Sequence, residues 1–150
     1  MKPYRISIKK FVRLLPLGEK KILRLAALIL KGEKIPHAEI SIAIVGDKRM
    51  ADYAEKYARR RYRTDVFAFD LSDTGSELIG QIIANSQLAR EQARKLKTNP
   101  AAELALYITH GLLHLTHYDD HTKKNAQKMH HRTEKYLRQT GFKKIPPLPA

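Results

Sequence analysis

The stretch that decides the fold is residues 100–121, which read PAAELALYITHGLLHLTHYDDH. Pro100 suits the first turn of a helix, and the apolar residues after it continue a helical pattern to about Thr116. His110 and His114 stand four residues apart near the end of this helix. That spacing places both imidazoles on one face, one turn apart. The stretch therefore predicts an apolar helix that presents two metal-ligand-type side chains.

Outward from this helix, the chain alternates between strand-like and helix-like segments. Runs rich in Ile, Val and Phe or alternating in polarity predict strands over 4–9, 40–45, 64–69 and 78–84. Helices are expected over 17–31, 47–61, 86–97, 100–116 and 122–139, with Asp47 and Ser86 as N-caps. A turn is expected at 72–75, and the Pro-rich tail cannot be helical. We expect one α/β (α+β) domain over 1–150, with a mixed sheet of about four strands, about five helices and a zincin-like histidine helix.

The composition excludes several classes of protein and favours an anionic partner. The 150 residues contain no Cys, which rules out disulfide frameworks, Cys-ligated zinc fingers and thiol nucleophiles. No apolar run approaches the roughly 20 residues that span a bilayer. The formal net charge is +14, with +8 in residues 1–34 and +7 in residues 121–150, while residues 64–120 carry −4. A cytoplasmic protein that binds nucleic acid is the expectation, against a generic basic protein whose charge only keeps it soluble.

The histidines predict a metal site that one straight helix cannot complete. His110, His114, His117 and His121 follow a 4-3-4 spacing, which would spread them over roughly 16 Å of helix axis. The ligand atoms of one zinc ion lie about 2 Å from it, so the chain must turn back after His114. The third ligand then comes from Asp120 or His121. With three protein ligands, one coordination position stays open for water, as in catalytic zinc sites.

The residue after His110 argues against one class of metal-dependent enzyme. It is Gly111, so the chain lacks the carboxylate that serves as the base in H-E-x-x-H metalloproteases. Peptidase activity is therefore disfavoured.

Residues 110–121 resemble H-G-x-L-H-L-x-G-Y-D-H, the signature of the YbeY family of bacterial metal-dependent endoribonucleases. Residues 64–69 are similar to the family's T-D-V-L-S-F strand, and Tyr57 with Arg59 resembles its Tyr-Arg pair. The family arginine falls on Ala58 when the segments are aligned without a gap.

Two departures concern the turn after the histidine helix. The family glycine is His117, which would be strained if that position requires a positive φ. One extra residue follows Tyr118, so the family's last histidine falls on Asp120 without a gap and on His121 with a shift of one. We prefer His121 as the third ligand and keep Asp120 in the site.

The resemblance implies a zinc-dependent, single-strand-specific endoribonuclease. It would mature the 3′ end of small-subunit ribosomal RNA and act in ribosome quality control, with one Zn²⁺ per chain, RNA and the ribosome as partners, and neither a membrane nor a nucleotide cofactor. Arg59 and Asp119 are the candidate catalytic residues. The candidate RNA contacts are Arg59, Arg60, Arg61, Arg63, Lys123 and Lys124. The alternative is a non-catalytic RNA- or ribosome-binding factor whose metal is structural, which four closing ligands would favour.

Overall fold

The computed structural model describes residues 3–73 and 77–147. Four strands form one mixed sheet in the order β1-β2-β4-β3. Strands β1 (Tyr4–Lys10), β2 (Ala38–Val45) and β4 (Leu78–Asn85) run parallel, and β3 (Val66–Asp70) pairs antiparallel with β4 at one edge. The described helices are α1 (Glu19–Gly32), α2 (Asp47–Ala58), α3 (Ser86–Leu96), α4 (Pro100–Leu115) and α5 (Lys123–Gln139). The expected fold class is confirmed.

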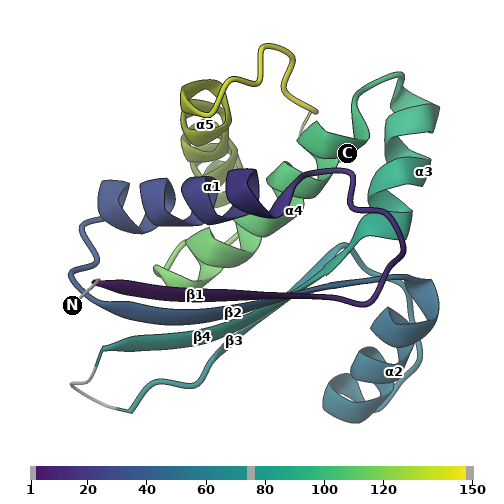
Figure 1. The fold of residues 1–150 in the computed structure, drawn as a ribbon, viewed down its shortest axis with the longest axis horizontal. Coiled ribbons are helices and arrows are strands. Elements are labelled where there is room, and N and C mark those ends of the chain that lie inside the picture. Colours follow the sequence, from purple (N-terminus) through teal and green to yellow (C-terminus); the bar gives the residue numbers. More distant parts are fainter. Residues whose placement is uncertain (1–2, 74–76, 148–150) are drawn as a thin grey trace.

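The helices cover the sheet unequally. Figure 1 shows α1, α4 and α5 above the sheet, with α2 below it at one end. Alternation along β2 explains the two layers, because successive side chains point to opposite faces. Ile40, Ile42 and Ile44 belong to the large core shared with α1 and α4. Ala43 and Val45 belong to a smaller cluster completed by Met50 of α2 and Ile83 of β4.

Helix α4 lies at the centre of the larger core. It contacts α1, α3, α5, β3 and β4, and every residue from Ala102 to Leu113 is buried. Gly111 lies where α4 closely approaches the sheet. A Cβ atom there would lie 3.1 Å from Val66 Cγ2 and 3.2 Å from Ile82 Cγ2. The glycine of the histidine motif therefore lets α4 pack closely against β3 and β4.

Helix α2 is shorter than its sequence pattern predicts. It ends at Ala58 rather than near residue 61, because Arg59 adopts a left-handed conformation with φ of 59°. The expected cap is also wrong: Gly46 is the N-cap, and Asp47 is the first helical residue. The Asp47 carboxylate instead accepts hydrogen bonds from Asn85 Nδ2 and Arg63 Nε, both at 2.8 Å.

The cap of α3 is one residue earlier than predicted. Asn85 is the N-cap, and its side chain accepts the N–H of Leu88 at 3.1 Å. The Ser86 hydroxyl donates to the Val45 carbonyl, with 3.4 Å between the oxygens. Of the turn predicted at 72–75, Thr74 and Gly75 lie outside the described residues.

Within residues 3–73 and 77–147, no helix is both long and apolar enough to cross a bilayer.

Candidate functional site

The C-terminus of α4 orients His114. The N–H of Tyr118 donates to the Leu113 carbonyl at 3.0 Å, and the N–H of His117 donates to the His114 carbonyl at 3.2 Å. These two bonds form a Schellman motif, which folds the chain back after the helix. His114 Nδ1 lies 3.1 Å from the Tyr118 carbonyl oxygen. Because a carbonyl only accepts, Nδ1 carries the proton and Nε2 keeps its lone pair, the form that binds a metal.

His117 occupies the left-handed position of this motif, with φ of 79°. The position therefore requires the positive φ that glycine adopts without strain. His117 is exposed and belongs to the turn, so it does not continue the row of histidines on the helix.

His110 is buried, with 8% of its surface exposed, and its Nε2 has no hydrogen-bond partner among the described residues. The pKa of His110 is lowered to about 4, and burial is the largest cause. The neighbouring imidazoles of His130 and His114 contribute to this lowering, and the carboxylate of Asp120 opposes it. His110 is therefore neutral at physiological pH, which leaves one ring nitrogen with a lone pair.

The two candidates for the third ligand differ in their relation to His110. The carboxylate of Asp120 is close enough for its charge to act on His110, although its side chain is exposed. The side chain of His121 is also exposed, and its backbone N–H donates to Asp119 Oδ1 at 3.1 Å. Of the two candidates, Asp120 is the one whose charge acts on His110, and it is also the residue that aligns without a gap.

Asp119 organises the start of α5. Its Oδ1 accepts the N–H of His121 and, at 3.0 Å, the side-chain amide of Asn125. These hydrogen bonds lower the pKa of Asp119, and His114 lies near enough for its charge to add to the effect. The N-cap of α5 is Thr122, whose hydroxyl accepts the N–H of Asn125 at 3.0 Å.

The described side chains are not gathered into a finished metal centre. Within residues 3–73 and 77–147, no three His, Asp or Glu side chains are grouped so that they could hold an ion. The chemistry of the donors still fits a metal, because His110 has an unpaired buried nitrogen and His114 has a fixed tautomer.

His130 is a neighbour that the sequence pattern did not predict. It lies on α5, and its ring centroid is 6.4 Å from that of His110. The sequence signal that could have pointed to His130 is its spacing of four residues from Glu134, which places both on one face of α5. In the structure, Glu134 Oε1 lies 3.4 Å from His130 Nε2.

The arginines predicted to bind RNA divide into two groups. Arg61 pairs with Asp52 at 2.8 Å and Glu55 at 2.6 Å. Arg63 pairs with Asp47 at 2.8 Å and with Glu91, and these partners raise its pKa. Arg59 and Arg60 are exposed and, among the described residues, have no ion pair.

Strand β3 shows where these arginines lie relative to the histidines. Before β3, the charge of Arg63 acts to lower the pKa of Tyr107 in the middle of α4, against the larger effect of burial. At the start of β3, Val66 lies against Gly111. At its end, the charge of His117 lowers the pKa of Asp70. The segment from Arg63 to Asp70 therefore runs alongside α4, from the middle of that helix to its C-terminus. The arginines precede β3, so they are displaced along α4 from the histidine turn.

Lys123 and Lys124 occupy the first turn of α5, where both are exposed. The positive end of the helix dipole disfavours cations there. The two lysines therefore concentrate positive charge beside the loop that carries Asp119 and Asp120.

A buried carboxylate ties the histidine turn to the rest of the core. Glu33, the C-cap of α1, accepts hydrogen bonds from Arg132 and Tyr136 of α5. Burial acts to raise the pKa of Glu33, but hydrogen bonds from Tyr136, Arg132 and Tyr118 outweigh it and lower the pKa. Tyr118 belongs to the Schellman turn, so this network connects α1 and α5 to the residue that orients His114.

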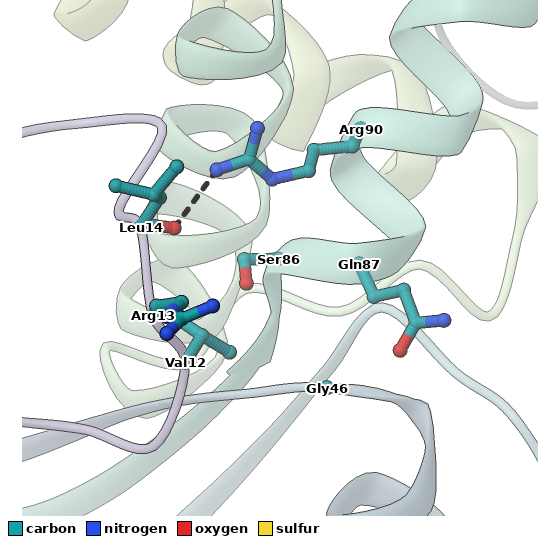
Figure 2. A pocket seen from close by; sticks show the side chains of 7 residues that line it. All are labelled: Val12, Arg13, Leu14, Gly46, Ser86, Gln87 and Arg90. Carbon is teal, nitrogen blue, oxygen red and sulfur yellow. Dashed lines mark hydrogen bonds between the residues drawn. The ribbon is translucent and has the colours of Figure 1, made fainter.

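A separate pocket of about 290 Å³ opens at the C-terminal ends of β2 and β4. Figure 2 shows that Val12, Ser86 and Arg90 line it, with Arg90 donating to the Leu14 carbonyl at 2.8 Å. The lining contains none of the predicted site residues.

The sheet, its covering helices and the two histidines of α4 define an α/β protein built around a histidine-bearing central helix. A family model described as "Endoribonuclease YbeY" matches residues 15–141. The chain belongs to this family, whose members are hydrolytic endoribonucleases. The family resemblance expected from the sequence is thereby confirmed.

Individual relatives agree with the family model. The chain is 34% identical over 107 residues to an "Endoribonuclease YbeY" from Anaeromyxobacter sp. (strain Fw109-5), which covers 70% of this chain and 56% of that protein. It is 32% identical over 113 residues to the one from Endomicrobium trichonymphae, covering 75% and 79%. The chain thus spans little more than half the length of the first of these relatives.

A solved structure supports the fold alone. The solution structure of TM1509 from Thermotoga maritima superposes with a TM-score of 0.65 at 24% identity. The match covers 91% of this chain and 88% of that one.

Proposed function

We propose that this chain is a metal-dependent endoribonuclease that cuts single-stranded RNA. It acts in the cytoplasm, trims the 3′ end of small-subunit ribosomal RNA, takes part in ribosome quality control and holds one Zn²⁺ per chain. The observation that carries the proposal is the pair His110 and His114 on α4. Both imidazoles can offer a lone pair, and they do so in a chain of the YbeY family.

His110 and His114 would hold the metal ion. Asp120 is the carboxylate whose charge reaches His110, which supports it over His121 as the further ligand. When bound, the metal would polarise a phosphoryl oxygen and lower the pKa of a bound water. The Schellman turn orients His114 through the Tyr118 carbonyl, and the burial of His110 keeps that imidazole neutral.

The remaining residues would bind and position the RNA. Lys123 and Lys124 place two charges beside the loop that follows α4, and such charges follow a phosphate backbone. Arg59 and Arg60 are better candidates for phosphate contacts than Arg61 and Arg63, because the latter two are held in ion pairs. Asp119 positions the loop through its bonds to His121 and Asn125.

The test is cleavage of matched single-stranded and duplex RNA, with metal content measured by plasma mass spectrometry. We expect about one zinc per chain. Cleavage should be confined to single strands, lost after chelation and restored by zinc. His114→Ala should lose the metal and reduce cleavage by at least about 100-fold. His37→Ala, which changes an exposed histidine between α1 and β2, is the matched control. Cleavage that survives both chelation and His114→Ala would contradict the proposal.

A second pair of variants separates the enzyme from a binding factor with a structural metal. Asp120→Ala and His121→Ala are each assayed for metal content. If both lose the ion, four protein ligands close the site, and the non-catalytic alternative gains support.

A further inference from the structure

Aromatic side chains of β3 and α2 meet on the face of the sheet that carries α2. Along β3, Val66 and Ala68 pack into the large core. Phe67 and Phe69 alternate with them, so these two rings point to the opposite face. There the ring of Phe69 contacts that of Tyr57 on α2, with centroids 4.7 Å apart.

The aromatic contacts continue at both ends of this pair. Tyr53 and Tyr57 have centroids 6.2 Å apart and nearly parallel planes. Phe67 lies 5.9 Å from Phe69 and 6.0 Å from Tyr62, again between ring centroids. The chain has seven Tyr and four Phe residues, and five of these eleven form this one continuous aromatic row. So strong a concentration on one face requires an explanation.

The small core explains the row only in part. Tyr53, Phe67 and Phe69 pack against the cluster that includes Met50, which accounts for their buried sides. Tyr57 instead has 48% of its surface exposed. Exposed aromatic area beside a core is typical of a surface that binds a partner.

Positive charges stand beside the exposed rings. Lys56 Nζ lies 5.2 Å from the ring centroid of Tyr57, and Arg60 Cζ lies 5.0 Å from that of Tyr62. Arg59, between these two cations, is exposed. Within residues 3–73 and 77–147, none of the three cations forms an ion pair with a carboxylate.

The acidic residues of α2 do not cancel this charge. Asp52 and Glu55 both pair with Arg61, and Asp47 pairs with Arg63. The cations beside the aromatic row therefore remain available to an anionic partner.

Single-stranded nucleic acid is the partner that matches both features. Each nucleotide offers a planar base that stacks on an aromatic ring and a phosphate that attracts a cation. In a duplex the base faces are already stacked on one another, so an exposed ring cannot reach them. An acidic protein surface would satisfy the cations but offers no planar group to each ring.

The aromatic row also leads toward the histidine turn. Phe69 precedes Asp70, the last residue of β3. Hydrogen bonds from Ser72 lower the pKa of Asp70, and the charge of His117 in the turn adds to this lowering. Because β3 is the edge strand of the sheet, a bound strand can pass over this edge from the row to the end of α4.

We propose that the aromatic row binds the bases of single-stranded RNA by stacking, with Tyr57 and Tyr62 as the rings that the bases contact. Lys56, Arg59 and Arg60 bind the phosphates between those bases. This inference rests on the proposed function and names where the RNA is held away from the histidines. It also gives a physical cause for single-strand specificity, because paired bases cannot stack on the row.

The experiment separates base stacking from charge. Two fluorescent probes are used: a nuclease-resistant 2′-O-methyl oligoadenylate, and a strand of the same length and charge that lacks the bases. Binding to the full chain is measured by anisotropy, and electrophoresis confirms that the probes stay intact. The variants are Tyr57→Leu, which keeps an apolar contact for Phe69, and Phe11→Leu, with circular dichroism to confirm folding.

Phe11 provides a matched control for the loss of an exposed ring beside a cation. It is 36% exposed, and Arg49 Cζ lies 4.0 Å from its ring centroid. Among the described residues it contacts no other aromatic ring.

We expect the wild type to bind oligoadenylate at least about 5-fold more tightly than the base-free strand. Tyr57→Leu should bind oligoadenylate at least about 5-fold more weakly than the wild type does and leave binding of the base-free strand unchanged. Phe11→Leu should leave both affinities unchanged. In wild-type protein with ¹³C-labelled tyrosine, the Tyr57 ring resonances should shift upfield with oligoadenylate and not with the base-free strand.

Two results would overturn the inference: equal wild-type affinity for the two strands, or normal binding of both by Tyr57→Leu. The labelled wild-type spectrum decides the matter even if the variant unfolds. Zinc-dependent cleavage is assayed separately. Cleavage without base-dependent binding overturns this inference alone. Base-dependent binding without cleavage supports the aromatic row and overturns the proposed enzymatic function.

Discussion

The imidazole of His114 is hydrogen-bonded to the backbone of the turn that follows it, with 3.1 Å between Nδ1 and the Tyr118 carbonyl oxygen. The side chain and the turn therefore stabilise each other's geometry. A change in the turn should alter the orientation of the imidazole, and the turn depends on the left-handed conformation of His117.

Replacing His117 with glycine should stabilise the protein. A non-glycine residue in the left-handed conformation destabilises the folded state by about 1–2 kcal/mol, and glycine removes this strain. Glycine also makes the unfolded chain more flexible, which offsets part of the stabilisation. We expect His117→Gly to raise the free energy of unfolding by about 0.5–1 kcal/mol, measured by urea denaturation. His117→Ala retains a Cβ and should give no such gain. A destabilised glycine variant would show that the His117 side chain makes a compensating interaction.

Removing the charge of Glu33 should destabilise the folded state. Its carboxylate accepts hydrogen bonds from Arg132 and Tyr136, and Glu33→Gln leaves a partly buried guanidinium without its counter-ion. We expect a loss of about 1–3 kcal/mol in the free energy of unfolding. Tyr136→Phe removes one donor and keeps the ring, so its loss should be smaller.

The same carboxylate should make stability depend on acid. The pKa of Glu33 in the folded state lies below its ordinary value of 4.5. A depressed pKa stabilises the folded protein fully above the unfolded value, and this contribution disappears as the pH falls through the folded value. In denaturation series between neutral and acidic pH, Glu33→Gln should therefore lose less stability than the wild type below about pH 4.5. Parallel curves for the two proteins would contradict this assignment.

A methyl group at Gly111 should push α4 away from the sheet. Its Cβ would meet Val66 and Ile82 at 3.1–3.3 Å, closer than ordinary contacts. Helix propensity alone predicts that Gly111→Ala stabilises by about 1 kcal/mol, whereas overpacking costs about 1–3 kcal/mol. We expect net destabilisation of about 1 kcal/mol by thermal unfolding. A stabilised variant would mean that α4 and the sheet move apart enough to accept the methyl group without losing stability.

Replacing the two lysines at the start of α5 should stabilise the folded protein and weaken its binding to RNA. Replacing Lys123 and Lys124 with Gln removes unfavourable charges from the helix N-terminus, so the folded state should gain about 0.3–1 kcal/mol for each. Binding of single-stranded RNA, measured by fluorescence anisotropy, should weaken, and its logarithmic salt slope should fall by about 0.7 per lysine. The matched control is Lys20→Gln with Lys21→Gln, in the first turn of α1. Equal losses of RNA binding in both double variants would assign the effect to net charge alone.

Local patterns were sufficient for much of the fold and for part of the site. The alternation around Ile40–Ile44 and the apolar period of residues 100–115 predicted β2 and α4, because strand and helix periodicity reflect burial on one or more faces. The errors lie at element ends. Arg59 ends α2 early, and Asn85 rather than Ser86 caps α3. The carboxylate of Asp47, which was predicted to cap α2, instead accepts a hydrogen bond from Asn85, 38 positions away in the chain. Such long-range partners leave no periodic signal.

The sequence by itself determined that two imidazoles share one face near the end of α4, since four residues are about one helical turn and that relationship is local. Only the tertiary structure decided which groups lie beside them. It brings the charge of Asp120, rather than the His121 side chain, to bear on His110, and it commits Arg61 and Arg63 to ion pairs. It also packs α5 against α4, so that His130 lies beside His110. These relationships depend on how helices and loops pack in three dimensions, and spacing along the chain does not contain that information.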